Sequence, residues 1–186
     1  MIRLSSLFRI QLAPKRGIGI IGLQRACSGL PPNVAVPFAL VAMGVKPSAD
    51  ISVHATKAGS LRNLLKDAAV HYAEPLYLTD EGWRCFLISA DEDILRELVR
   101  VVSRSLTGRE DDGHSHKHLG SLFGYPGCCI QRFIQEFTSN PKWAGYMKES
   151  RAPDKHDGTL HFWCSPDCSD SLRLQRDHLR IITSQS

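Results

Sequence analysis

Two closely spaced pairs of cysteines are the residues of this chain best suited to chemistry. Cys128 and Cys129 are adjacent in "GYPGCCIQRFIQEF", and Cys164 and Cys168 lie further along the chain in "HFWCSPDC". A deprotonated thiol is the form of cysteine that binds metals and attacks electrophiles. The two pairs therefore predict either a metal site or a site for thiol chemistry.

Each pair is also expected to lie where a helix begins. A Pro-Gly dipeptide precedes Cys128 and Cys129, which places both in the first turn of one helix. Ser-Pro-Asp at residues 165–167 supplies an N-cap, a proline at the first helical position and an acid, which together predict a second helix start. Cys168 would lie in its first turn, with Cys164 just before it. Because the positive end of a helix dipole favours thiolates, two such ends brought together predict four thiolates around one centre.

The four cysteines suit two kinds of metal group. A [4Fe–4S] cluster needs four thiolates, and Cys128, Cys129, Cys164 and Cys168 supply that number. Zinc needs four nitrogen or sulfur ligands, which Cys164, Cys168, His161 and one of the adjacent cysteines could provide. Adjacent side chains diverge, which suits the separate iron corners of a cluster better than one small ion. We therefore expect an iron–sulfur cluster first and zinc as the alternative.

Two histidines are candidate ligands beside the cysteines. His161 lies three residues before Cys164, and His118 closes the run "HSHKH" and adjoins the helix that leads to the adjacent cysteines. His114 and His116 of the same run are expected to be solvated, because histidines in a polar connection are more often exposed than bound to metal.

The remaining cysteines and the N-terminal residues indicate where in the cell the protein is located. Cys85 within "WRCFLIS" and Cys27 are expected to be packed, structural thiols. The chain shows no secretory signal, so a reducing, cytoplasmic location is expected. Residues 1–49 contain six basic residues and no Asp or Glu, so the alternative is the mitochondrial matrix, with residues 1–26 as a transit peptide.

The overall composition is that of an ordinary globular protein. The 186 residues are 42% hydrophobic and 23% charged, which is enough for one buried core with or without a small appendage. The net charge of +4 is mild and the basic residues are scattered, so the sequence gives no strong nucleic-acid signal. No apolar run is long enough to span a membrane. A redox or protein partner is expected, of unknown identity.

The chain is predicted to have four parts and a mixed α/β (α+β) fold. Residues 1–32 form a basic leader, disordered or targeting, and residues 33–106 form an α/β domain. Residues 107–118 form a polar, histidine-rich linker, and residues 119–186 form a cysteine-rich, mainly helical region that carries the metal site.

The α/β domain is expected to be a small sandwich in the order strand, helix, strand, strand, helix. A strand is predicted at 51–55, and Ser60 is expected to cap a helix over 60–73. Residues 75–89 predict two strands joined by a turn at 80–82. Asp91 is expected to cap a helix that runs to residue 106.

The two cysteine motifs resemble those of a domain-of-unknown-function family found largely in archaea and bacteria. Members pair a Gly-Tyr-Pro-x-Cys-Cys motif with a later His-x-x-Cys-Ser-x-x-Cys motif, and the likeness covers the C-terminal third of this chain. The matching residues are Gly124, Tyr125, Pro126, Cys128, Cys129, His161, Cys164, Ser165 and Cys168. The resemblance implies that the two cysteine groups belong to one site, and it names no reaction.

Three functions remain open from the sequence. The first is a metal-binding protein that serves in electron transfer, in metal or cluster handling, or as an accessory subunit. The second is a metal-free thiol enzyme in which Cys128 or Cys129 is a nucleophile or part of a redox dithiol and His161 is the base. The third is a non-catalytic interaction module whose cysteines only pack.

Overall fold

The chain divides into two units, Met1–Ser103 and Arg104–Ser186, and each is described by itself. The computed structural model describes residues 8–11, 27, 30–75, 82–106, 112–139, 165 and 167–183. Among these residues, no helix combines the length and the apolar character needed to cross a membrane.

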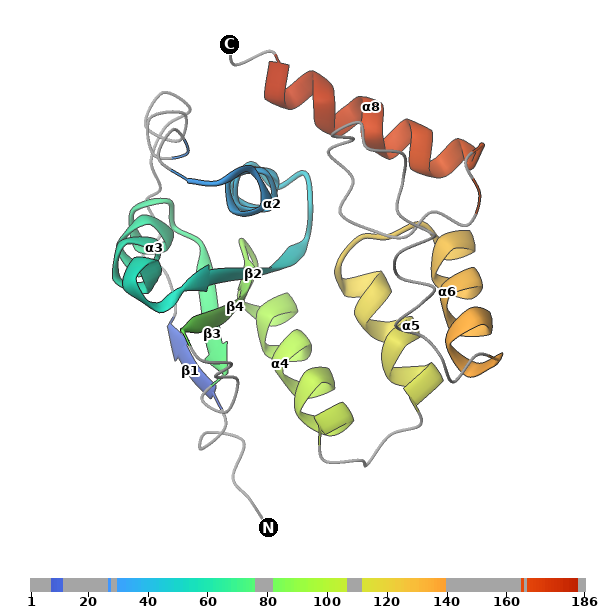
Figure 1. The fold of residues 1–186 in the computed structure, drawn as a ribbon, viewed down its shortest axis with the longest axis horizontal. Helices are drawn as coiled ribbons and strands as arrows, with labels where there is room; N and C mark the ends of the chain where they lie inside the picture. Colours follow the sequence, from blue (N-terminus) through green and yellow to red (C-terminus); the bar gives the residue numbers. More distant parts are fainter. Residues whose placement is uncertain are drawn as a thin grey trace. The chain divides into compact units, whose positions relative to one another are not determined.

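The first unit is built around one antiparallel sheet, with strand order β1-β3-β4-β2 (Figure 1). Its elements are β1 (Phe8–Gln11), α2 (Pro32–Ala42), β2 (Ser48–His54), α3 (Ala55–Asp67), β3 (His71–Pro75), β4 (Trp83–Ser89) and α4 (Glu92–Leu106). Because β2 and β3 both pair antiparallel with β4, α3 connects two strands that run in the same direction with β4 between them. The predicted mixed α/β class is confirmed.

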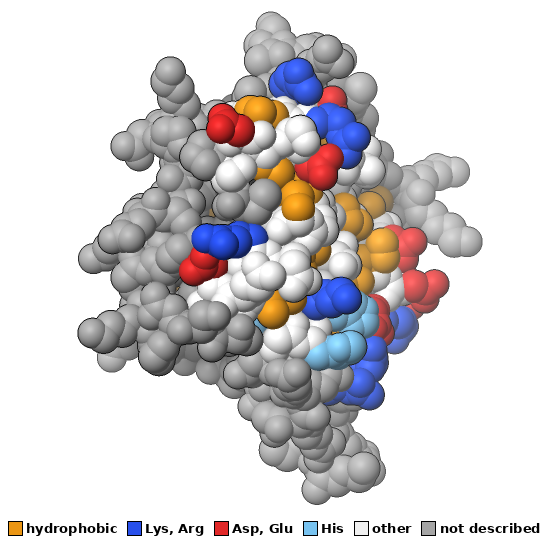
Figure 2. Space-filling model, turned by 90° about the vertical axis from the view of Figure 1, so that its right-hand side faces the viewer, with side chains coloured by type: hydrophobic (Ala, Val, Ile, Leu, Met, Phe, Trp, Pro, Cys, Tyr) orange, Lys and Arg blue, Asp and Glu red, His pale blue; other side chains and the backbone are white. Residues whose placement is uncertain are grey.

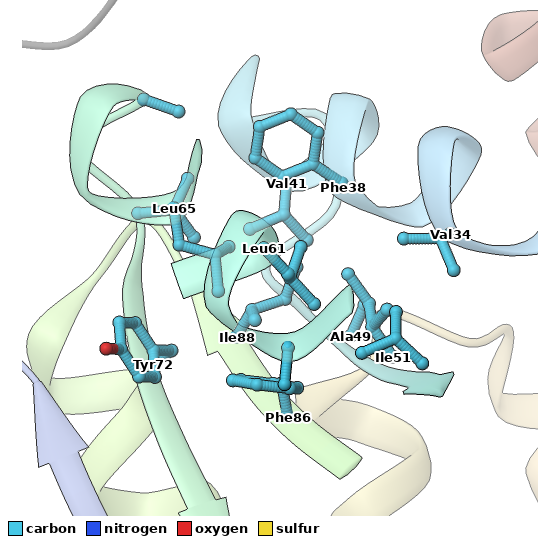
Figure 3. Packing of buried hydrophobic residues seen from close by; sticks show 14 residues of the cluster. Val34, Phe38, Val41, Ala49, Ile51, Leu61, Leu65, Tyr72, Phe86 and Ile88 are labelled. Carbon is cyan, nitrogen blue, oxygen red and sulfur yellow. The ribbon is translucent and has the colours of Figure 1, made fainter. Parts of the chain in front are cut away.

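One face of the sheet carries a cluster of buried hydrophobic side chains. Along β2 the burial alternates, with Ile51 and Val53 buried and Ser52 and His54 exposed, as a strand with one covered face requires. Side chains of α2 and α3 pack on the buried face together with residues of β3 and β4 (Figure 3). The largest of these side chains are Phe38, Leu61, Leu65, Tyr72, Phe86 and Ile88.

The helix α3 begins and ends earlier than the sequence predicts. It starts at Ala55, with His54 as N-cap through its Nδ1, which accepts the Thr56 amide at 3.4 Å, so the prediction of Ser60 as the cap was wrong. Histidine is not among the favoured N-cap residues, which hid this start. The helix stops at Asp67, because Ala69 adopts φ 55° and the chain then enters β3. The predicted cap of α4 is confirmed, since Asp91 accepts the amides of Asp93 and Ile94.

Two segments expected to lack regular structure contain some. Within the predicted leader 1–32, β1 pairs with β3 in the register Phe8↔Pro75, and the remaining leader residues are largely outside the described part. Within the predicted linker 107–118, helix α5 already begins at Asp112. Strand pairing uses backbone groups that every sequence has, and α5 is too polar for its apolar spacing to reveal it.

The second unit contains three described helices, α5 (Asp112–Leu122), α6 (Gly127–Ser139) and α8 (Ser169–Thr183). The helices α5 and α6 pack closely where Gly120 faces Ile130. A Cβ atom at position 120 would lie 2.7 Å from the Ile130 Cγ1, so only glycine allows this approach. This contact with α5 positions the first turns of α6, where the adjacent cysteines lie.

Candidate metal centre

The Gly-Tyr-Pro-Gly stretch forms the tight connection that starts α6. Gly124 adopts φ 72° and ends α5, with its amide bonded to Ser121 and the Tyr125 amide bonded to Gly120. These two bonds satisfy the last carbonyls of α5, as in other glycine-terminated helices. The carbonyl of Pro126 then accepts the Ile130 amide, which is the first hydrogen bond of α6. The predicted helical segments on both sides of this break are confirmed.

Cys168 is the N-cap of α8. Its carbonyl accepts the Leu172 amide at 2.9 Å, and its Sγ accepts the Ser171 amide at 3.5 Å. The prediction that Ser165 caps this helix was wrong: Ser165 lies one turn earlier, where its carbonyl accepts the Cys168 amide at 3.2 Å. A Ser-Pro-Asp sequence suits a turn as well as a helix start. The shift moves the Cys168 thiol to the very end of the helix dipole.

Three thiols from the ends of two helices meet at one point. The Sγ of Cys128 lies 3.9 Å from that of Cys129 and 3.6 Å from that of Cys168, and the Cys129–Cys168 sulfur distance is 3.7 Å. Among the described residues, these three side chains form a group close enough to hold a metal ion. The expectation that the N-terminal ends of two helices bring cysteines together is therefore confirmed for three of the four.

The adjacent cysteines do not diverge as the sequence argument assumed. Their sulfurs are 3.9 Å apart, which is only slightly more than the 3.6 and 3.7 Å that separate them from the Cys168 sulfur. Cys128 is the second and Cys129 the third residue of α6. In this first turn, the two side chains can reach the same point in front of the helix. The objection to a single ion on adjacent cysteines therefore does not apply here.

The group has a buried side and an exposed side. Cys129 is 2% and Cys168 7% exposed, whereas Cys128 is exposed to solvent. On the exposed side, the Asp170 carboxylate lies 3.8 Å from the Cys128 Sγ and accepts from it when the thiol is protonated. Asp170 also pairs with Arg173 at 3.2 Å. The pairing offsets part of the negative charge that a carboxylate adds beside thiolates.

Ser171 contacts two of the three thiols from the buried side. Its Oγ lies 3.1 Å from the Cys129 Sγ, and its amide is the one that Cys168 accepts. The Ser171 side chain is completely buried. Neither Ser171 nor Asp170 was a sequence candidate. The spacing from an N-cap at Cys168 to the third helical residue would have pointed to Ser171.

The other predicted ligands are distributed as follows. Cys164 and His161 lie outside the described residues. His118 lies on α5 and is not a member of the three-thiol group. His116 packs edge-on against Phe133 of α6 at 5.2 Å between ring centroids, rather than facing solvent as expected.

The two cysteines of the first unit, Cys27 and Cys85, differ from the three-thiol group in that burial raises the pKa of each thiol. Cys27 packs against the core, and burial raises the pKa of its thiol. Cys85 lies on β4 opposite Ser52, and burial, with a smaller contribution from the Asp50 carboxylate, raises its pKa to about 11. Both thus behave as the packed, structural thiols that the sequence predicts.

Charges on the second unit are mixed in sign. Arg132 pairs with Glu136 along α6, and Asp170 pairs with Arg173 along α8. On the face shown in Figure 2, acidic and basic side chains of the described residues lie next to one another.

Comparisons of this chain with protein-family models, with curated proteins and with solved structures gave no match. The likeness of the two cysteine motifs to a prokaryotic family stays a prediction. The functional argument therefore depends on the three-thiol group itself.

Proposed function

We propose that this protein binds one zinc ion through Cys128, Cys129 and Cys168, with Cys164 as the fourth thiolate. The ion would hold the N-terminal ends of α6 and α8 together. Both helix dipoles direct their positive ends at the thiolates, which offsets the net negative charge of a four-thiolate zinc site.

The spacing of the three sulfurs is the observation that carries this proposal. In a tetrahedral site with zinc–sulfur bonds of about 2.3 Å, neighbouring sulfurs are separated by about 3.8 Å. The three separations found here, 3.6, 3.7 and 3.9 Å, all lie close to that value. This agreement supports a single tetrahedral ion with these thiols as three of its ligands.

The same spacing favours a single ion over the iron–sulfur cluster that the sequence predicts first. A [4Fe–4S] cluster binds each thiolate on a different iron, so its cysteine sulfurs must be spread more widely than the ligands of one atom. Three sulfurs within 4.8 Å of one another would have to separate before a cluster could fit.

Cys164 is the preferred fourth ligand because it precedes Cys168 by four residues in "CSPDC". A short chain segment between two ligands is a common feature of structural zinc sites, and an all-cysteine site is closed and structural rather than catalytic. His161 is the competing fourth ligand, and Asp170 is less suited because its carboxylate is not within reach of all three sulfurs.

The proposal is tested by metal analysis of serine variants. Serine is chosen because it is itself a favoured N-cap, so that Cys168→Ser removes a thiolate but keeps the start of α8. We expect about one zinc per wild-type chain and a large loss in Cys128→Ser, Cys129→Ser, Cys168→Ser and Cys164→Ser. Cys27→Ser and Cys85→Ser are the matched controls and should retain the full zinc content.

Other results would contradict the proposal. Iron with inorganic sulfide in the purified protein would favour the cluster. If Cys164→Ser kept its full zinc content and His161→Ala lost zinc, the fourth ligand would be His161 and not Cys164. Absence of metal would leave a redox dithiol as the better account, since the exposed Cys128 lies 3.6 Å from Cys168.

A further inference from the structure

We infer that Ser171 is a positioning residue of the metal centre, which orients two of the thiolates and tunes their donor strength. The inference rests on the proposed function, since it concerns the same thiols. It assigns a role to a residue that supplies no ligand atom to the group.

The two hydrogen bonds of Ser171 reach different helices. The Oγ lies 3.1 Å from the sulfur of Cys129 on α6, and the backbone amide lies 3.5 Å from the sulfur of Cys168, which caps α8. Once both sulfurs are thiolates they can only accept, so the Ser171 hydroxyl and amide are the donors. One residue thereby fixes the positions of two sulfurs that come from different elements.

Because these hydrogen bonds are buried, their loss should lower the metal affinity of the site. Ser171 is 0% exposed, and Cys129 and Cys168 are nearly as well buried. When a buried thiolate loses a hydrogen-bond donor, water cannot take the donor's place. The loss of the hydrogen bond therefore lowers the affinity of the thiolates for the metal. Residues that hydrogen-bond to ligands in this way contribute roughly 10- to 100-fold to metal affinity.

A hydrogen bond to a thiolate also changes its electronic character. The donor proton stabilises the sulfur lone pair and raises the energy needed to move an electron from sulfur to the metal. Removing the Ser171 hydroxyl should therefore move the thiolate-to-metal charge-transfer absorption to lower energy. A residue that served only to pack the helices would not cause this shift.

The test uses the full-length chain titrated with Co²⁺, whose thiolate complexes absorb light. For Ser171→Ala we expect an affinity roughly 10- to 100-fold lower, measured by chelator competition, and a charge-transfer band at lower energy. Ser169→Ala is the matched control, because Ser169 lies in the same first turn of α8 but is exposed. Its affinity and spectrum should equal those of the wild type.

Each other outcome would overturn the inference. Ser171→Ala with wild-type affinity and spectrum would do so, and so would weaker binding with an unshifted band, which would mean a packing role. If Ser171→Ala does not fold, Ser171→Thr and Ser171→Val replace it: the two have the same shape, and only threonine should keep the wild-type band. A wild-type chain that binds no cobalt would refute the proposed function, and this inference with it.

Discussion

At the level of single residues, Cys85 and Cys128 differ in solvent exposure and in thiol chemistry. Cys85 is held in the protonated form by burial on β4, with its pKa raised to about 11. Cys128, by contrast, is exposed to solvent in the first turn of α6. Their reactivity toward an alkylating agent should therefore differ strongly.

We expect Cys128 to be alkylated much faster than Cys85 in metal-depleted, folded protein at pH 8. With a pKa of about 11, only about one Cys85 in a thousand is deprotonated at that pH. The rate at Cys85 should rise about tenfold per pH unit and level off near pH 11. Timed iodoacetamide labelling with peptide mass spectrometry measures both, and equal rates at Cys85 and Cys128 at pH 8 would contradict the assignment.

The site residues differ in how far the sequence could reveal them. The cysteines stand out because their type and their spacing are unusual, and three of the four predicted thiols do meet. Ser171 could not be found in the same way, since a serine in the first turn of a helix is common. Its role appears only when Cys168 is known to be the N-cap.

At the level of elements, the site depends on how closely α5 and α6 approach. Gly120→Ala should weaken this contact, because the added Cβ would lie 2.7 Å from the Ile130 Cγ1. We expect a loss of about 1–3 kcal/mol in the free energy of unfolding of the second unit, with weaker metal binding because the start of α6 moves.

Gly127→Ala is the matched control for Gly120→Ala. Gly127 also lies in this pair of helices, but its Cβ would meet no atom within 4 Å. Urea unfolding with and without zinc measures both variants. If Gly120→Ala and Gly127→Ala were equally stable and bound zinc equally well, the close contact would not be needed to place the cysteines.

Element types could be predicted from the sequence better than element ends. The alternation of Ile51 and Val53 revealed β2, and Asp91 revealed α4, because each signal acts through local backbone geometry. The starts of α3 and α8 were misplaced because His54 and Cys168 cap them. These side chains act as caps only in their folded surroundings. The strand β1 escaped prediction because it depends on pairing with a partner distant in sequence.

At the level of the whole molecule, the three-thiol group lies in one of the two units. The three thiols and Ser171 all lie within Arg104–Ser186, whereas the sheet and its core lie within Met1–Ser103. A bound ion stabilises the folded state of the unit that supplies its ligands, in proportion to its affinity and concentration. Zinc bound at the proposed site should therefore stabilise the unit Arg104–Ser186 and not the unit Met1–Ser103.

Hydrogen exchange of the full chain, with zinc and after chelation, should show this locality. We expect amides of α6 and α8 to exchange faster once zinc is removed, because the ends of these helices lose their common ligand. Amides of α3 and β4 should keep the same protection. Equal loss of protection in both units would show that the metal centre supports the whole fold instead.

X-ray absorption spectroscopy of the purified full-length protein tests the metal centre most directly, because it reports the identity, number and distance of the ligand atoms. The predicted result is zinc with four sulfur neighbours at about 2.3 Å and no second metal nearby. Iron with a metal–metal distance in the spectrum, or zinc with mainly oxygen and nitrogen neighbours, would contradict a single-ion thiolate site on Cys128, Cys129, Cys164 and Cys168.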